Sequence, residues 1–181
     1  MSQAAGKNER LYVSWAEYHR LIETLALRVY ESGYAFDSLL CLARGGLRVG
    51  DVISRIFERP LAILATSSYR EAAGTQRGAL DIATHITTTG GDLHGRLLLV
   101  DDLVDTGTTL ARVVELLRSR FHQLTEVRTA VIWYKAVSSF RPDYHVVYLP
   151  HSPWIQQPFE EYDTLRPPQL AARLQAYGRV D

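Results

Sequence analysis

The chain has 181 residues, in which 20 Lys and Arg residues balance 20 Asp and Glu residues for a formal net charge of +0. Hydrophobic residues make up 46% and charged residues 22%, which is typical of a globular protein with one buried core. A dedicated nucleic-acid binder needs a surplus of Lys and Arg, and a polybasic membrane anchor needs a basic block. The composition argues against both classes.

Neither the N-terminus nor the cysteine content predicts export. Residues 1–15 lack an apolar signal core, and the longest apolar runs of the chain are too short to span a bilayer. Cys41 is the single cysteine, so the fold does not depend on a disulfide or an oxidising compartment. We therefore expect a cytoplasmic protein with a single domain over residues 1–181.

Residues 15–31 are predicted to form the first helix. Ser14 stands three residues before Glu17, which is the spacing of a capping box in which the serine accepts a hydrogen bond from the glutamate amide. Apolar residues then recur at helical spacing from Leu21 to Val29, and a glycine follows.

The middle of the chain alternates short apolar runs with helically spaced apolar residues. Strands are predicted over residues 38–42, 61–65, 97–100, 127–133 and 144–149, and helices over residues 47–57 and 110–117. The polar residues 67–78 predict a long loop, and residues 79–87 a modest antiparallel ribbon. Strand–helix–strand units predict an α/β fold: a twisted, mostly parallel sheet with helices on both faces.

Three parts of the chain differ in composition. The predicted core covers about residues 11–149. Residues 150–164 are rich in proline and aromatic side chains and form a small additional segment. Residues 165–181 form a tail, with a short helix predicted over residues 170–177.

One segment, residues 97–110, carries most of the chemical information, and it reads LLLVDDLVDTGTTL. Asp101, Asp102 and Asp105 follow an apolar strand, and open parallel sheets bind ligands at the carboxyl ends of their strands. The glycine, the threonines and the following helix N-terminus offer donors that suit a phosphate. Acids beside a phosphate are favourable when the ligand also carries hydroxyl groups or a divalent cation. A sugar phosphate with a magnesium ion fits every one of these features.

Other interpretations of residues 97–110 fit less well. The Gly-Lys-Ser/Thr of a Walker loop and the Gly-x-Gly-x-x-Gly of a dinucleotide site are both missing. A merely capped helix accounts for the threonines but not for three acids within five residues. The six histidines lack zinc-ligand spacing, and Cys41 is interpreted as a buried strand residue rather than a nucleophile.

Residues 97–110 resemble the phosphoribosyl pyrophosphate (PRPP) motif of the type I phosphoribosyltransferases, in which four apolar residues precede two acids and Asp-Thr-Gly-Thr. The resemblance covers roughly residues 11–163. The segments in family order are Tyr12–Trp15, Ala43–Leu47, Ser67–Tyr69 with Gln76 and Arg77, Lys135, and Trp154–Pro158. Together they resemble the 6-oxopurine branch, and within it the bacterial xanthine-guanine group. The resemblance implies the type I phosphoribosyltransferase fold with a small hood over residues 150–164.

The resemblance also implies the residues that bind PRPP. Asp101 and Asp102 would hold the ribose hydroxyls, and Asp102 would contact Mg²⁺, the implied cofactor. The loop around the 5′-phosphate would consist of Leu103, Val104, Asp105, Thr106, Gly107, Thr108 and Thr109. Arg44 and Gly45 would meet the pyrophosphate, which Arg77 would reach once its loop closes. The peptide bond before Arg44 is often cis in this family.

The purine-binding residues follow from the same resemblance. Asp105 would be the catalytic residue, since its carboxylate can take the N7 proton while N9 attacks and can stabilise a developing oxocarbenium ion. Lys135 would select a 6-oxo group, because an ammonium donates hydrogen bonds but cannot accept them. Trp154 would stack on the base. Ile155 would offer main-chain groups to the base edge, and Glu160 would lie near the far edge of the base or the metal.

The resemblance therefore implies a purine salvage enzyme that transfers the phosphoribosyl group of PRPP to N9 of guanine, xanthine or hypoxanthine and releases pyrophosphate. It also implies a homodimer or homotetramer. Gln156 is neutral where the xanthine-preferring group is expected to have an acid, so the choice of base stays open. Two alternatives are a phosphoribosyltransferase for adenine or a pyrimidine and a nucleotide-binding regulator with the same fold. The neutral charge and the presence of Asp105 disfavour the regulator.

Overall fold

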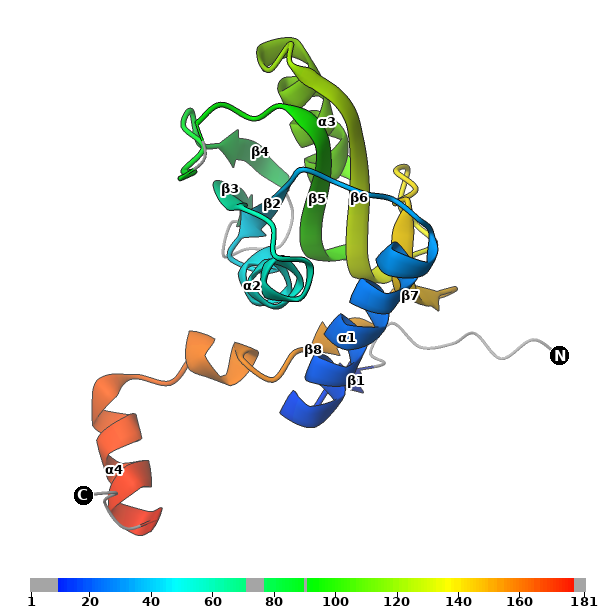
Figure 1. The fold of residues 1–181 in the computed structure, drawn as a ribbon. Helices are drawn as coiled ribbons and strands as arrows, with labels where there is room; N and C mark the ends of the chain where they lie inside the picture. The colour runs from blue at the N-terminus through cyan, green and yellow to red at the C-terminus, as the bar shows by residue number, and fades with distance from the viewer. Residues whose placement is uncertain (1–9, 71–76, 90, 178–181) are drawn as a thin grey trace, which may run out of the picture. The chain divides into compact units, whose positions relative to one another are not determined.

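A computed structural model describes residues 10–70, 77–89 and 91–177 (Figure 1). The chain divides into a larger compact unit, residues 20–152, and a smaller one that joins residues 1–19 with residues 153–181. The larger unit holds β2 (Ser38–Ala43), α2 (Gly46–Phe57), β3 (Leu61–Arg70), β4 (Arg77–Ile82), β5 (Gly95–Val104), α3 (Thr108–Arg120), β6 (Leu124–Lys135) and β7 (Tyr144–Leu149). α1 (Trp15–Glu31) begins in the smaller unit and continues into the larger.

The central sheet has the strand order β4-β3-β2-β5-β6-β7, and every neighbouring pair is parallel except β3 and β4. This confirms the predicted mostly parallel sheet. Cys41 of β2 lies opposite Val100 of β5, and Val104 of β5 lies opposite Tyr134 of β6. Because parallel strands share one direction, the ends of β2, β5 and β6 meet at the same edge of the sheet.

The two faces of the sheet are covered by different helices (Figure 1). Gly50 of α2 packs on one face, since a Cβ added to it would lie 2.6 Å from the Cβ of Cys41 and 3.3 Å from Leu39. The core on the other face contains Leu40, Leu42, Leu97, Leu99 and, from α3, Leu110, Val113 and Leu117. Because successive side chains of a strand point to opposite faces, α2 and α3 lie on opposite sides of β2, as predicted.

The smaller unit has its own short sheet. β1 (Arg10–Tyr12) pairs in parallel with β8 (Trp154–Gln156), followed by the 3-10 helix η1 (Glu160–Asp163) and α4 (Pro167–Tyr177). At the start of α1, the Ser14 hydroxyl oxygen accepts a hydrogen bond of 3.2 Å from the Glu17 N–H, which confirms the predicted cap. The strand β1 was not predicted from the sequence.

Several predicted boundaries need correction. β5 continues beyond the two acids to Val104, and β6 continues to Lys135. β3 and β4 pair in antiparallel fashion up to Arg70 and Arg77, so residues 67–70 and 77–78 of the predicted loop are strand residues. The prediction for residues 71–76 falls outside the described residues. Backbone hydrogen bonds extend these strands whatever the polarity of their side chains. α4 begins three residues earlier than predicted, at Pro167, a residue type suited to a first helical turn.

None of the helices in the described part of the chain is both long enough and apolar enough to cross a membrane.

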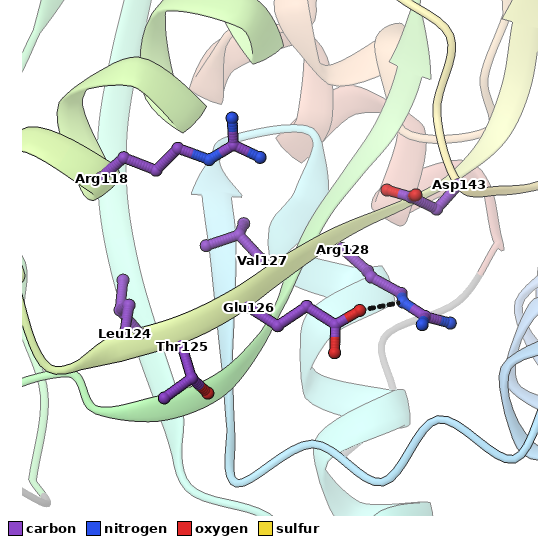
Figure 2. A pocket seen from close by; sticks show the side chains of 7 residues that line it. All are labelled: Arg118, Leu124, Thr125, Glu126, Val127, Arg128 and Asp143. Atoms are coloured by element: carbon purple, nitrogen blue, oxygen red, sulfur yellow. Dashed lines mark hydrogen bonds and ion pairs between the residues drawn. The ribbon is translucent and has the colours of Figure 1, made fainter.

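The amino end of β6 borders a hollow of about 420 Å³ (Figure 2). Its lining residues are Arg118, Leu124, Thr125, Glu126, Val127, Arg128 and Asp143. Since β6 runs from Leu124 to Lys135, this hollow lies at the opposite end of the strand from Lys135.

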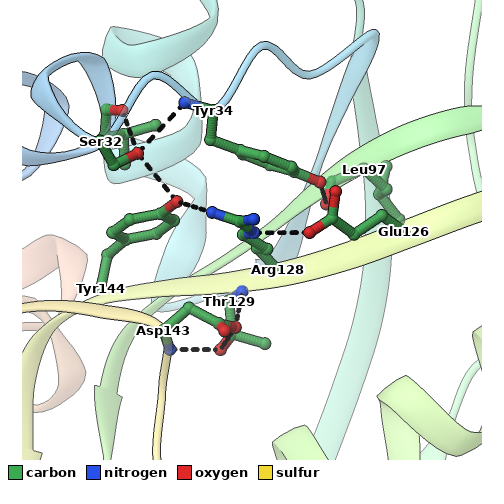
Figure 3. Close-up of polar contacts among 9 residues, drawn as sticks. Ser32, Tyr34, Leu97, Glu126, Arg128, Thr129, Asp143 and Tyr144 are labelled. Carbon is green, nitrogen blue, oxygen red and sulfur yellow. Dashed lines mark hydrogen bonds and ion pairs between the residues drawn. The ribbon is translucent and has the colours of Figure 1, made fainter.

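A polar network ties the strands together near this end of the sheet (Figure 3). The Arg128 guanidinium donates to the Glu126 carboxylate at 2.7 Å and to the Tyr144 hydroxyl at 2.8 Å, and it lies 4.4 Å from the centre of the Tyr34 ring. The Tyr34 hydroxyl donates to the Leu97 carbonyl of β5 at 3.1 Å. Burial raises the pKa of Tyr34 well above its usual range. These contacts hold β5, β6 and β7 in register with the segment that follows α1.

Candidate functional site

Asp101 and Asp102 lie near the end of β5. The Asp102 N–H donates to the Asp101 carboxylate at 3.0 Å, and the Leu103 N–H donates to the Asp102 carboxylate at 2.7 Å. Burial raises the pKa of Asp101 well above its usual range, and the neighbouring charge of Asp102 raises it further. The two acids thus form one carboxylate pair.

The turn between β2 and α2 passes directly against this pair. The Ala43–Arg44 peptide bond is cis, as is common in the family that the sequence resembles. A Cβ added to Gly45 would lie 2.5 Å from a carboxylate oxygen of Asp102, and one added to Gly46 would lie 2.6 Å from the Val100 carbonyl oxygen. A side chain at Gly46 would therefore push this turn away from the β5 backbone, and one at Gly45 would displace the Asp102 carboxylate. The structure brings Gly45 to Asp102, with Arg44 exposed beside it.

The predicted phosphate loop is only partly a loop, because Leu103 and Val104 are still strand residues. The turn proper begins at Asp105. Gly107 has a φ of +85°, a left-handed conformation that favours glycine, and it precedes α3 as its N-terminal cap residue without a side-chain bond to the first turn. The hydroxyl groups of Thr106 and Thr108 lie 3.1 Å apart. A helix N-terminus with amide donors beside hydroxyl groups suits a phosphate.

Asp105 and Lys135 meet across the ends of β5 and β6. The Lys135 ammonium lies 3.5 Å from a carboxylate oxygen of Asp105. The sequence predicted that Lys135 follows a strand ending at residue 133; the strand instead continues, and Lys135 is the last residue of β6. The structure thus brings together two of the five residues that the resemblance assigns to the base.

The turn after β6 contributes residues that sequence reasoning missed. The Ser139 N–H and hydroxyl both donate to the Thr106 carbonyl, at 3.0 Å and 3.1 Å. The Ser138 N–H donates to the Lys135 carbonyl at 3.0 Å, and a Cβ added to Gly107 would lie 2.5 Å from the Cβ of Phe140. In the sequence these are ordinary turn residues, and only their position shortly after Lys135 could have drawn attention to them.

The remaining predicted residues belong to other elements of the chain. Arg77 is the first residue of β4, and its side chain is outside the described part of the structure. Trp154, Ile155 and Glu160 belong to the smaller unit. The Trp154 ring N–H donates to the Glu160 carboxylate at 3.1 Å, Trp154 is 46% exposed, and Ile155 is buried. Trp154 and Glu160 are therefore in contact with each other.

The carboxylate pair fits a magnesium ion that arrives with a phosphorylated ligand. Over residues 10–70, 77–89 and 91–177, no group of three or more His, Cys, Asp or Glu side chains is arranged to hold a metal ion. Mg²⁺ usually keeps several waters and binds through one or two carboxylates together with substrate phosphates. Asp101 and Asp102 supply two adjacent carboxylates of this kind.

The chain is similar to known phosphoribosyltransferases in both sequence and structure. The family described as "Phosphoribosyl transferase domain" matches residues 14–164. The xanthine-guanine phosphoribosyltransferase of Idiomarina loihiensis is 32% identical over 154 residues, which are 84% of this chain and 88% of that protein. The purine phosphoribosyltransferase of Pyrococcus horikoshii superimposes with a TM-score of 0.70 at 29% identity, over 87% of this chain and 98% of that one.

A more distant structure shows the same fold. The xanthine-guanine-hypoxanthine phosphoribosyltransferase of Helicobacter pylori superimposes with a TM-score of 0.69 at 20% identity, over 92% of this chain and 99% of that one. These matches agree with two features of the site, the acids at the end of β5 and the turn before α3 that suits a phosphate. The chain belongs to the phosphoribosyl transferase family.

Proposed function

We propose that this protein is a purine salvage enzyme that transfers the phosphoribosyl group of PRPP to N9 of a 6-oxopurine and releases pyrophosphate. The observation that carries the proposal is the meeting of three features at one sheet edge: the acid pair Asp101–Asp102, the turn before α3, and the Lys135–Asp105 ion pair. The sequence and structural relatives named above act on purines, which supports this substrate class.

PRPP binding is assigned to the larger unit. The amides and hydroxyl groups of residues 105–109 would receive the 5′-phosphate, and Asp101 and Asp102 would receive the ribose hydroxyls. Arg44 and the Gly45 amide would contact the pyrophosphate, with Arg77 joining them. Asp102 would hold the Mg²⁺ that accompanies PRPP, and the ion would supply charge neutralisation for the leaving pyrophosphate.

In the proposed reaction the purine N9 forms a bond to C1 of the ribose while the bond from C1 to the pyrophosphate oxygen breaks. The pyrophosphate leaves with the electron pair of that bond. Asp105 accepts the N7 proton, which places electron density on N9, and its charge stabilises positive charge on the ribose. Lys135 donates a hydrogen bond to the 6-oxo group and offers no acceptor to a 6-amino group.

Further contacts with the base are assigned to residues of the smaller unit. We assign stacking on the purine to Trp154, main-chain contacts with the base edge to Ile155, and a contact near the far edge to Glu160. Guanine, xanthine and hypoxanthine all carry the 6-oxo group that Lys135 would read, and Gln156 leaves the preference among them open. We also expect the protein to act in the cytoplasm as a homodimer or homotetramer.

A pyrophosphate-release assay tests the proposal. The protein would be incubated with PRPP, Mg²⁺ and one base at a time: guanine, xanthine, hypoxanthine, adenine or uracil. We expect release with at least one 6-oxopurine and not with adenine or uracil. Release with adenine or uracil alone would assign the chain to another nucleobase. Binding of a purine nucleotide without turnover on any base would favour a regulator.

A further inference from the structure

The turn formed by residues 136–140 lies against the peptide bond between Thr106 and Gly107. Two donors of one residue, the N–H and the hydroxyl of Ser139, reach the Thr106 carbonyl oxygen at 3.0 Å and 3.1 Å. A carbonyl oxygen has two lone pairs, so both bonds can be made at once. We propose that Ser139, through its hydroxyl, is a positioning residue that sets the direction of the Gly107 N–H toward the 5′-phosphate of the substrate.

The direction follows from the planarity of the peptide. Among the described residues Ala43–Arg44 is the cis peptide bond, and the Thr106–Gly107 bond is therefore trans. In a trans peptide the C=O and N–H groups point in opposite directions. Because Ser139 holds the Thr106 C=O toward residues 136–140, the Gly107 N–H points away from that turn, just before the first turn of α3.

The turn is stiff enough to act as a support. The Ser138 hydroxyl donates to the Phe140 carbonyl at 2.8 Å and accepts from the Phe140 N–H at 3.1 Å, which closes the turn on itself. Gly107 is packed against it, since an added Cβ would lie 2.5 Å from Phe140 and 2.6 Å from the Ser138 hydroxyl oxygen. The close contact with Gly107 and the two hydrogen bonds from Ser139 are all made by this turn, and together they restrict the orientation of the Thr106–Gly107 peptide.

The same turn directly follows Lys135, one of the residues assigned to the base. The Ser138 N–H donates to the Lys135 carbonyl at 3.0 Å. The turn formed by residues 136–140 therefore connects Lys135 with the phosphate loop, and Ser139 makes the hydrogen bonds to that loop. This inference rests on the proposed function, because it takes residues 105–109 as the phosphate site.

A nucleotide and its nucleoside differ only in the 5′-phosphate. Comparing their binding therefore separates an effect on the phosphate site from an effect on the whole binding site. The dissociation constants of guanosine 5′-monophosphate and guanosine would be measured for the wild type, Ser139→Ala and Ser139→Thr. Ser139 is exposed, so truncation opens no cavity. Ser119→Ala is the matched control, because that hydroxyl donates to a carbonyl within α3, Leu116, at 3.0 Å.

We expect Ser139→Ala to weaken binding of the monophosphate about 2- to 10-fold, the range for one hydrogen bond, and to leave guanosine binding unchanged. Ser139→Thr keeps the hydroxyl and should restore binding, and Ser119→Ala should have no effect. The inference is overturned when Ser139→Ala binds the monophosphate like the wild type, or weakens nucleotide and nucleoside by the same factor.

A further variant distinguishes a failure of this inference from a failure of the proposed function. Thr108→Ala removes a hydroxyl of the phosphate loop itself. If Thr108→Ala weakens the monophosphate and Ser139→Ala does not, Ser139 has no positioning role but the loop assignment holds. If neither variant changes the preference for the monophosphate over guanosine, the loop is not the phosphate site, and both proposals fall.

Discussion

The Lys135 ammonium lies 3.5 Å from the Asp105 carboxylate. The lysine side chain is only 9% exposed, whereas the aspartate side chain is 42% exposed. A lysine with so little exposure is stable when a counter-charge accompanies it. The partner, by contrast, keeps an open side toward solvent. A base that offers a carbonyl and an adjacent N–H can therefore contact both side chains without separating them.

Replacing Asp105 tests its role in proton transfer. Asp105→Asn keeps the shape of the side chain but removes the proton acceptor, so we expect turnover to fall by about 10²- to 10⁴-fold, the range for a general base. The Michaelis constant for PRPP should change little. Steady-state kinetics of pyrophosphate release measures both, with Asp51→Asn as a control, because Asp51 lies on α2 and pairs with Arg55 at 2.9 Å. Wild-type turnover of Asp105→Asn would end the general-base assignment.

Replacing Lys135 tests the reading of the 6-oxo group. Glutamine carries both a donor and an acceptor, so Lys135→Gln can accept a hydrogen bond from a 6-amino group where lysine cannot. We expect the ratio of kcat/KM for guanine over adenine to fall by at least about tenfold. If the activity on both bases falls by the same factor, Lys135 supports the site but does not discriminate between them.

Two glycine substitutions separate a binding defect from a packing defect. The Cβ of Gly45→Ala would lie 2.5 Å from the Asp102 carboxylate, the mobile end of a side chain, so this variant should displace Asp102 and raise the Michaelis constant for PRPP with little loss of stability. The Cβ of Gly50→Ala would lie 2.6 Å from the Cβ of Cys41, which is held by β2. Overpacking of this kind costs about 1–3 kcal/mol, partly offset by the better helix propensity of alanine.

Thermal unfolding and PRPP kinetics of both glycine variants check this contrast. We expect Gly45→Ala to unfold close to the wild-type temperature with weakened PRPP binding, and Gly50→Ala to unfold earlier with PRPP binding retained. The reverse pattern would mean that the Gly45 turn is not part of the PRPP site.

The fold was predictable where the determinants are local. α1 begins with a serine cap and runs over an amphipathic stretch, and both of its ends were predicted correctly. The buried strands are continuous apolar runs, which can be recognised in the sequence without knowing which strands they pair with. β1 has neither signal: its three residues are held by backbone pairing with β8, where Tyr12 lies opposite Gln156. Such a distant partner leaves no periodic pattern in the sequence.

The candidate site divides in the same way. Asp101, Asp102 and the glycine turn before α3 belong to one contiguous motif, so residue types and spacing alone led to the phosphate-site hypothesis, which stays a prediction. The contact between Asp105 and Lys135, and that between Thr106 and Ser139, depend on the register of β5 against β6. That register is set by packing of the whole sheet, which the two segments do not encode locally.

The network around Arg128 should stabilise the fold without affecting the reaction, because it lies at the amino end of β6. Tyr144→Phe removes the hydroxyl that accepts from Arg128 at 2.8 Å and contacts the Ser32 hydroxyl at 2.9 Å. We expect a loss of about 1–2 kcal/mol in the free energy of unfolding, measured by denaturant titration. The kinetic constants should not change, and a fall in turnover at unchanged stability would contradict this division of roles.

The single cysteine reports on the packing of α2 against the sheet. Cys41 is fully buried, and burial raises the pKa of its thiol to about 11. Because the reactive form is the thiolate, a raised pKa leaves only about one part in a thousand reactive at pH 8, and each unit of rising pH increases that fraction about tenfold. We expect 5,5′-dithiobis(2-nitrobenzoic acid) to label one thiol in guanidinium chloride and almost none in the native protein. Gly50→Ala should accelerate native labelling, since its new methyl group displaces Cys41. Rapid stoichiometric labelling of the native wild type would show that α2 does not cover this face of β2.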